Sequence, residues 1–111
     1  SNLQDWAGKQ DIRLPYVPDY CCQPYHMFYL ILPVPEARDR FIAFLRKRSI
    51  HSVFHYLPLH QSSAGEKYAA SGSSCPVTED ISSRLVRLPF FNALSVNELE
   101  YIVAEIRSFS L

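Results

Sequence analysis

The sequence predicts an α+β fold in which helices cover a small, mostly antiparallel sheet. Three observations support this class. An apolar segment at residues 26–32 is typical of a strand, amphipathic segments at 36–48 and 95–107 are typical of helices, and shorter strand-like segments lie between them. The chain has 111 residues, which suits one domain, and 48% of them are hydrophobic. This composition supplies a core and argues against intrinsic disorder.

Residues 1–25 are predicted to be an extended lead-in, not a helix. They contain Pro15, Pro18 and Pro24, and each proline fixes its own backbone and lacks an amide donor. The aromatic side chains of this segment need cover, so we expect it to lie on the folded body or on a domain outside this chain. The chain is therefore divided into a lead-in, 1–25, and a domain, 26–111.

The segment 26–32 is apolar on both faces, which predicts a central strand covered on two sides. Pro33 follows it, and a helix is predicted over 36–48 because its apolar residues recur on one stripe with cations on the other. Acidic Glu36 at its start suits the helix dipole. Since two good helices hardly cover both faces of a sheet, the second face indicates that another domain packs here.

The middle of the chain is predicted to hold a second strand and a surface segment. Residues 52–56 are rich in β-branched and aromatic types, and Pro58 ends the strand. Residues 61–74 are polar and rich in serine and glycine, which predicts a surface excursion containing one helical turn.

Local signals define the last third of the chain well. Proline suits the first position of a helix, so Pro76 is expected to start a short helix that runs to residue 84. A third strand is predicted over 85–88. Ser95 and Glu98 have the spacing of a capping box, in which the side chain of each residue accepts a hydrogen bond from the backbone amide of the other. The last helix is therefore predicted to begin there.

Composition excludes several classes of function. Eleven basic residues balance eleven acidic ones, so the positive field of a nucleic-acid-binding protein is missing. No apolar run approaches the roughly 20 residues of a membrane span. The start of the sequence lacks the basic and apolar regions of a signal peptide, and Cys21-Cys22 are best explained as two thiols in a reducing compartment. We therefore expect a cytoplasmic protein that binds neither nucleic acid nor membrane.

Three histidines, His51, His55 and His60, fall within ten residues and raise the question of a zinc site. No cysteine or carboxylate stands at ligand spacing, and structural zinc needs about four tight ligands. Ordinary surface or loop histidines are the preferred interpretation, so no metal ligand is predicted. No serine sits in a G-x-S-x-G elbow, and no catalytic residue is predicted within the chain.

The lysines bear on covalent cofactor chemistry. A Schiff-base lysine must be partly desolvated so that its amine is neutral. The chain has only Lys9 in the lead-in, Lys47 on a cationic helix face and Lys67 in the polar excursion. None has the required setting, so no cofactor-binding residue is predicted in this chain.

Five short segments between residue 26 and the C-terminus share one order and spacing with a known family. Singly none is diagnostic, because Leu-Pro pairs and capping boxes are common. The segments are His26-Met27-Phe28-Tyr29-Leu30; Arg40 through Leu45 with Ile50; His55-Tyr56-x-Pro58-Leu59-His60; Ser82-x-Arg84-Leu85-x-Arg87-Leu88-Pro89; and Leu94-Ser95.

Together these segments resemble the C-terminal small domain of sugar-nucleotide aminotransferases of the DegT type. Within that family they are most similar to the transaminases that make dTDP-4-amino-4,6-dideoxygalactose from dTDP-4-keto-6-deoxyglucose, and Ala64-Gly65 strengthens the leaning toward transaminases of dTDP-sugars. The resemblance implies the small-domain fold of pyridoxal-phosphate enzymes of the aspartate-aminotransferase type. It also implies a large domain that this chain lacks, from which residues 1–25 would lead in.

The resemblance further implies what the whole enzyme does. A homodimer uses pyridoxal phosphate to move an amino group, with glutamate as donor, onto a dTDP-4-keto-6-deoxy sugar, in nucleotide-sugar and cell-surface polysaccharide biosynthesis. The fragment by itself is expected to be inactive and to bind no cofactor. The alternative is a free-standing interaction or assembly module whose exposed aromatic residues recruit a partner protein.

By position in the family, His55, Tyr56 and His60 would border the substrate cleft, with His60 the strongest candidate for a sugar-nucleotide contact. The alternative for His55 and Tyr56 is that they are alternating strand residues with packing roles.

Overall fold

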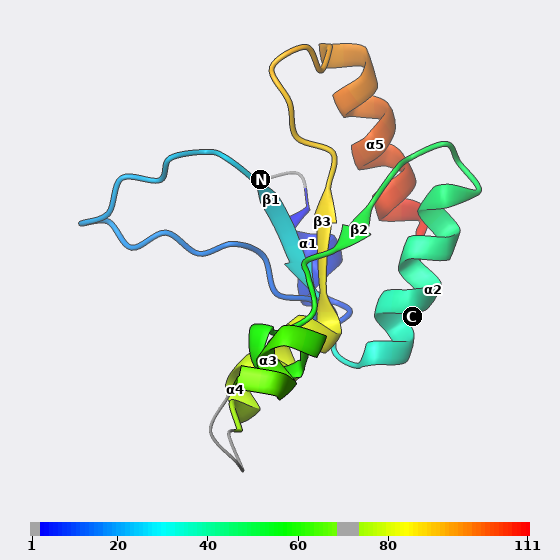
Figure 1. Cartoon of the computed structure of the whole chain (residues 1–111). Helices are drawn as coiled ribbons and strands as arrows, with labels where there is room; N and C mark the ends of the chain where they lie inside the picture. Colours follow the sequence, from blue (N-terminus) through cyan, green and yellow to red (C-terminus); the bar gives the residue numbers. More distant parts are fainter. Residues whose placement is uncertain (1–2, 69–73) are drawn as a thin grey trace.

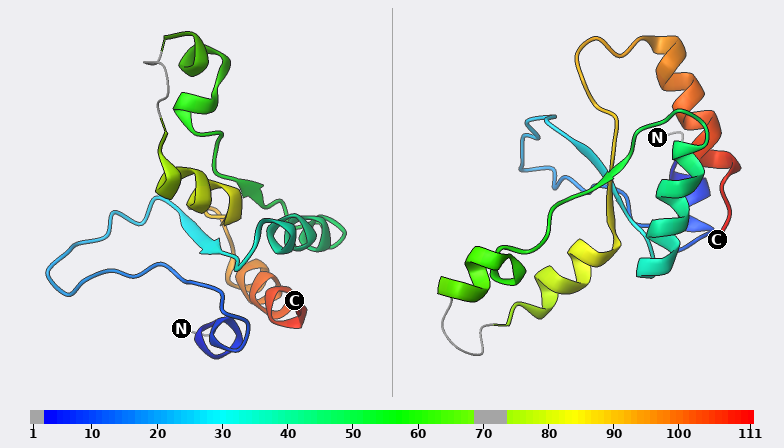
Figure 2. Two further views of the ribbon diagram at one scale, coloured as in Figure 1. Left: turned by 90° about the horizontal axis from the view of Figure 1, so that it is seen from below. Right: turned by 45° about the vertical axis from the view of Figure 1, so that its right-hand side comes forward.

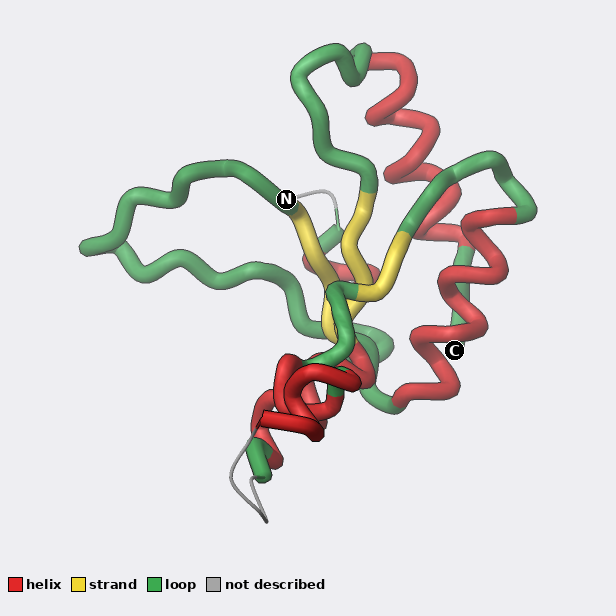
Figure 3. Tube along the Cα trace, in the orientation of Figure 1, coloured by secondary structure: helices red, strands yellow, loops and turns green. Residues whose placement is uncertain are grey.

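The computed structural model describes residues 3–68 and 74–111, so residues 69–73 of the predicted surface excursion lie outside the described part. It confirms the α+β class: a small antiparallel sheet is accompanied by helices (Figures 1 and 3). The elements in chain order are α1 (Gln4–Gly8), β1 (Phe28–Ile31), α2 (Pro35–Arg46), β2 (Val53–Phe54), the 3₁₀ turn η1 (Leu59–Gln61), α3 (Ser63–Tyr68), α4 (Pro76–Arg84), β3 (Leu85–Leu88) and α5 (Val96–Ser108).

The sheet has the strand order β1-β3-β2, with both pairings antiparallel. The central strand is therefore β3, and the prediction that residues 26–32 form the central strand is wrong. On its outer edge β1 carries a single bridge, in which Arg13 and Ile31 exchange backbone hydrogen bonds of 3.0 Å. Strand order depends on contacts between distant segments, which the apolar pattern of one strand does not reveal.

One face of the sheet packs against α2 and α5, which lie on the same side of it (Figure 1). Leu30 and Val86 are fully buried on this face, together with Phe41 of α2 and Ile106 of α5. Because side chains alternate along a strand, the neighbours of Leu30 and Val86 in β1 and β3 point to the opposite face. These neighbours are only half-buried, as expected for a face that the helices of this chain leave partly open.

The lead-in differs from its prediction, because residues 4–8 form helix α1. Trp6 is buried in the core, its ring lies 6.2 Å from that of Phe41, and its Nε1 donates a 2.9 Å hydrogen bond to the carbonyl of Phe109. The three prolines of the lead-in all come after this helix, so the argument from proline never applied to it. From Leu14 onward the chain does form the expected irregular excursion, which extends away from the body (Figure 2).

The local signals in the last third of the chain located its elements accurately. The predicted helix 76–84 and strand 85–88 have these bounds in the structure. The capping box is confirmed: Ser95 Oγ accepts from the amide of Glu98, and Glu98 Oε2 accepts from the amide of Ser95. The Ser95 hydroxyl also donates to Glu98 Oε2, and this bond first, then the bond from the Ser95 amide, lowers the pKa of Glu98.

Strand β2 is shorter than predicted, and its two residues are half-exposed at the sheet edge. The backbone turns at Tyr56, whose φ of 60° is incompatible with continuing the strand, and Pro58 follows. The predicted strand 52–56 therefore ends at Phe54. In the described residues no helix is long and apolar enough to cross a membrane.

The chain is more open than a compact domain of its size. Its radius of gyration is 15.8 Å, against about 13 Å expected for this length. The excursion after Leu14 and the pair α3–α4 project from the body (Figure 2). Large apolar side chains are exposed on the excursion, on the segment that leads to α3 and on α3 itself; they are Tyr16, Tyr20 and Tyr25, then Leu57 and Leu59, then Tyr68.

Candidate substrate-facing site

His60 lies in η1 and is held against the first turn of α4. Its Nε2 is 2.7 Å from Oε1 of Glu79, and its side chain is only 15% exposed. The predicted substrate residue is thus fixed by a carboxylate 19 positions along the chain. The sequence analysis did not identify this histidine–carboxylate pair.

Glu79 joins His60 to the start of the helix. Its Oε1 also accepts a 3.1 Å hydrogen bond from the amide of Cys75, the residue that precedes α4. The Cys75 amide first, and the His60 ring second, stabilise the carboxylate and lower the pKa of Glu79. The charged form of Glu79 therefore holds His60 and caps α4 at the same time.

Gly65 allows α3 to pack closely on the His60 turn. A Cβ atom at position 65 would lie 1.8 Å from the carbonyl oxygen of Leu59 and 2.8 Å from the Cα of His60. Ser62 completes the turn: its hydroxyl donates to Leu59 O and accepts from the Gly65 amide. The glycine of the Ala64-Gly65 pair thus has a physical role, because only glycine lets the backbone of α3 approach that of Leu59 and His60 this closely.

His55 and Tyr56 lie together where β2 ends. Their ring centroids are 4.7 Å apart with the planes tilted by 44°. Tyr56 is 68% exposed and its φ is positive, a conformation that costs energy for a residue with a side chain. The exposure of Tyr56 argues against a packing role for it. His55 is half-buried, and its Nδ1 is a buried atom without a hydrogen-bond partner among the described residues.

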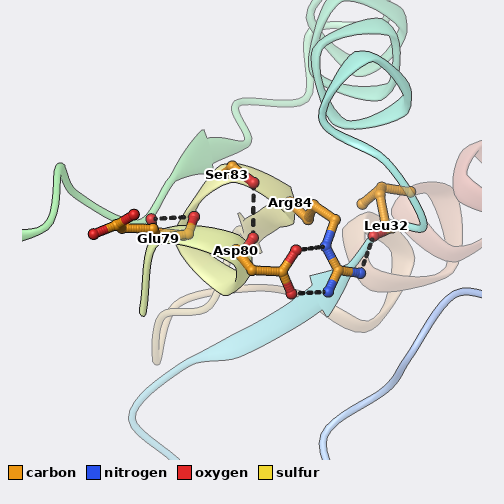
Figure 4. Close-up of polar contacts among 6 residues, drawn as sticks. Leu32, Glu79, Asp80, Ser83 and Arg84 are labelled. Atoms are coloured by element: carbon orange, nitrogen blue, oxygen red, sulfur yellow. Dashed lines mark hydrogen bonds and ion pairs between the residues drawn. The ribbon is translucent and has the colours of Figure 1, made fainter. Parts of the chain in front are cut away.

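Helix α4 is fastened to the sheet and to α2 by two arginines. Arg84 donates hydrogen bonds from Nε and Nη2 to the two carboxylate oxygens of Asp80, and its Nη1 donates a 3.0 Å hydrogen bond to the carbonyl of Leu32 (Figure 4). The guanidinium lowers the pKa of Asp80. Arg38 of α2 donates to the carbonyl of Ser82. These contacts fix the helix that in turn holds His60.

The structure therefore brings two of the three predicted site residues together and separates the third. His55 and Tyr56 contact one another, whereas His60 is turned toward α4, and in the described residues no hydrogen bond or ring contact joins it to either. Residues 3–68 and 74–111 contain no group of three histidine, cysteine, aspartate or glutamate side chains placed to hold a metal ion.

Comparison with known proteins decides the family. The model of the DegT/DnrJ/EryC1/StrS aminotransferase family matches residues 1–107. The chain belongs to this family. A curated relative, the dTDP-3-amino-3,6-dideoxy-alpha-D-galactopyranose transaminase of Aneurinibacillus thermoaerophilus, is 30% identical over 99 residues, which cover 88% of this chain and 26% of the relative.

Solved structures agree with the family assignment. DesV of S. venezuelae, solved in complex with a ketimine intermediate, is 26% identical with a TM-score of 0.81, and the match covers 96% of this chain and 28% of DesV. A DegT/DnrJ/EryC1/StrS aminotransferase from Brucella abortus is 27% identical with a TM-score of 0.73, with the same coverage of both chains. The chain thus spans little more than a quarter of the aminotransferases it matches.

The residues of this DegT-family chain do not fit pyridoxal phosphate as a covalently held cofactor. Lys9, Lys47 and Lys67 are all exposed, so none of these amines is desolvated. A fold neighbour from Streptococcus pneumoniae, 20% identical with a TM-score of 0.79, was solved in a PLP form. No lysine of these 111 residues therefore has the setting that a Schiff base requires.

Proposed function

We propose that this chain is the C-terminal small domain of a pyridoxal-phosphate-dependent aminotransferase that converts a dTDP-4-keto-6-deoxy sugar to its 4-amino sugar, with glutamate as donor. The observation that carries the proposal is the family match over residues 1–107, together with a dTDP-sugar transaminase as a relative. That relative is named for a 3-amino product, so the preference for C4 rests only on the resemblance of the five segments as a set.

The open side of the fold supports a missing large domain. One sheet face is covered by the helices of this chain, while the side chains of the other are half-buried and the radius of gyration is large for the length. In the proposal the large domain supplies the cofactor lysine and packs on this second face, and two such polypeptides form a dimer. The isolated chain is then inactive, and the complete enzyme works in the cytoplasm on precursors of cell-surface polysaccharide.

In the proposed enzyme the chain contributes to substrate binding and orientation. Tyr56 offers an exposed aromatic ring, a group on which a sugar or a base can stack. His55 lies against that ring. His60 is held by Glu79 with its Nε2 engaged, which leaves its other ring nitrogen to meet the substrate.

The experiment is an amino-transfer assay on the natural polypeptide that carries this domain. L-glutamate is supplied with dTDP-4-keto-6-deoxyglucose or with the corresponding 3-keto sugar, and the products are identified by NMR. We expect the 4-amino product, and we expect His60→Ala to raise KM for the sugar nucleotide by about tenfold or more. The matched control is His51→Ala, which removes an exposed histidine and leaves KM unchanged. Absence of amino transfer with either sugar would refute the proposal.

A free-standing assembly module is the second candidate. Its supporting observation is the row of exposed tyrosines, Tyr16, Tyr20 and Tyr25, on the excursion before β1. Sedimentation of the purified chain separates the candidates: a tight, specific dimer favours the module, and a monomer favours a domain that belongs to a larger enzyme.

A further inference from the structure

The contact between His60 and Glu79 determines which ring nitrogen of His60 carries the proton. The two residues meet through His60 Nε2 and Glu79 Oε1, which are 2.7 Å apart, and the same oxygen accepts a 3.1 Å hydrogen bond from the amide of Cys75. An ionised carboxylate only accepts hydrogen bonds, so Oε1 has the same role toward the ring as toward the amide. The proton of the His60 contact therefore lies on Nε2.

The other ring nitrogen, His60 Nδ1, makes no hydrogen bond with residues 3–68 or 74–111. The buried side-chain atoms that lack a partner among these residues are Ser52 Oγ and His55 Nδ1, so His60 Nδ1 keeps access to solvent in this part of the chain. A neutral ring with its proton on Nε2 presents Nδ1 as an acceptor. Since no described group pairs with Nδ1, a second N–H there would lack an acceptor on a ring that is only 15% exposed.

The surroundings of this nitrogen suit the binding of a small molecule. Turn η1 lies between β2 and the pair α3–α4, which projects from the body (Figure 2). The large side chains just before His60 along the chain, Tyr56, Leu57 and Leu59, are all more than half exposed. A fixed polar atom among apolar and aromatic side chains is typical of a site that orients its ligand through a single hydrogen bond.

We propose that His60 Nδ1 accepts a hydrogen bond from a hydroxyl group of the hexose ring of the sugar nucleotide, and that Glu79 is the positioning residue that keeps Nδ1 an acceptor. The inference rests on the proposed function, which supplies the sugar nucleotide as the ligand. Phosphate oxygens of the ionised diphosphate also only accept, so an acceptor at Nδ1 disfavours the phosphate end of the ligand and favours its hydroxyl-bearing end.

The protonation of the ring is tested by NMR on the natural polypeptide, labelled with isotopic histidine. The signals of His60 are assigned by their loss in His60→Gln, and the nitrogen shifts distinguish the Nε2–H ring from the Nδ1–H ring and from the cation. We expect the Nε2–H form at neutral pH, and a mixture of the two neutral forms in Glu79→Ala. A cationic or an Nδ1–H ring in the wild type would overturn the proposal, as would an unchanged ring in Glu79→Ala.

The recognised group is tested by calorimetric titration of the same polypeptide with dTDP and with dTDP-glucose. His60→Gln keeps an N–H for Glu79 but has no acceptor in place of Nδ1. We expect this variant to bind dTDP-glucose about tenfold more weakly and dTDP with unchanged affinity. The matched control is His51→Gln, which alters an exposed histidine and should leave both affinities unchanged.

Three outcomes of the titration would overturn the proposal. Equal weakening of both ligands in His60→Gln would place the contact on the nucleotide, unchanged binding of dTDP-glucose would show that no contact exists, and a wild type that does not bind dTDP-glucose would have no such ligand. Neither measurement involves amino transfer. Amino transfer without these effects of His60 therefore refutes this inference alone, and the effects without amino transfer refute the proposed function alone.

Discussion

His60 Nε2 and Glu79 Oε1 lie 2.7 Å apart, which ties the turn η1 to the first turn of α4. The strongest candidate for a substrate contact is thus positioned by a carboxylate that also accepts the amide of Cys75. Disturbing either side of this contact should alter the site without touching the core.

Glu79→Gln should loosen His60. The substitution keeps the shape but replaces a charge-assisted hydrogen bond by a weaker neutral one at both Cys75 and His60. We expect a lower melting temperature of the chain and a several-fold higher KM for the sugar nucleotide in the proposed enzyme. Glu66→Gln on α3, an exposed carboxylate, is the control and should change neither quantity. A KM equal to that of the wild type would show that Glu79 does not position His60.

Gly65→Ala should displace the His60 turn. The new Cβ would lie 1.8 Å from Leu59 O, so the backbone must move, at a cost of about 1–3 kcal/mol in the free energy of unfolding. The same substitution at Gly8 meets no atom within 4 Å and should leave stability unchanged or raise it by up to about 1 kcal/mol. Urea unfolding measures the free energy of unfolding of the two variants. Equal values would show that the fold does not require the close approach of position 65 to Leu59.

Trp6→Ala tests whether the start of the chain belongs to this domain. Trp6 packs on Phe41 and donates to Phe109 O, so we expect a loss of about 3–5 kcal/mol in the free energy of unfolding. Tyr20→Ala, in the excursion, removes a ring that is 89% exposed and should cost less than about 0.5 kcal/mol. Equal effects in the two variants would mean that residues 1–25 act as a single lead-in, as the sequence predicted.

Two serine-to-alanine substitutions should act in opposite directions. Ser52 is buried and its Oγ has no partner among the described residues, so Ser52→Ala should raise stability by about 1 kcal/mol. Ser95→Ala removes the cap of α5 and should lower stability by about 1 kcal/mol. Chemical unfolding of both variants decides this, and a destabilised Ser52→Ala would mean that the hydroxyl has a partner after all.

Acid should destabilise the chain through three carboxylates. The pKa values of Glu79, Asp80 and Glu98 are lowered on folding from ordinary values of 4.5, 3.8 and 4.5. The contribution of these carboxylates to the free energy of unfolding is therefore complete when the pH is above their ordinary pKa values. It is lost as the pH falls through the lower pKa values of the folded chain. Unfolding curves between pH 6 and the acid limit should show this fall, and Glu79→Gln should make it shallower. A stability that does not change over that range would exclude the three contacts as stabilising.

The sequence predicted those parts of the fold that local chemistry determines. Helix α4, strand β3 and the cap at Ser95 each have a proline or a capping residue at the boundary, and all three were located correctly. Helix α1 was missed because it is only five residues long and is held by Trp6 against Phe109, 103 positions away. Its apolar residues Leu3, Trp6 and Ala7 do have helical spacing, a signal that could have revealed it.

The candidate site could be predicted only in part. The segment from His55 to His60 was identified through its resemblance to the family, but its partners depend on how distant elements pack. Glu79 reaches His60 because α4 folds beside η1. This contact does not follow from spacing along the chain.

The central claim is that the lysine that binds the cofactor lies outside this chain, and covalent trapping tests it most directly. The purified 111-residue chain and the natural polypeptide that carries it are each mixed with pyridoxal phosphate, reduced with borohydride and digested for mass spectrometry. We predict one stoichiometric pyridoxyl-lysine in the natural polypeptide, outside these residues, and only trace labelling of the isolated chain. Stoichiometric labelling of Lys9, Lys47 or Lys67 would contradict the claim.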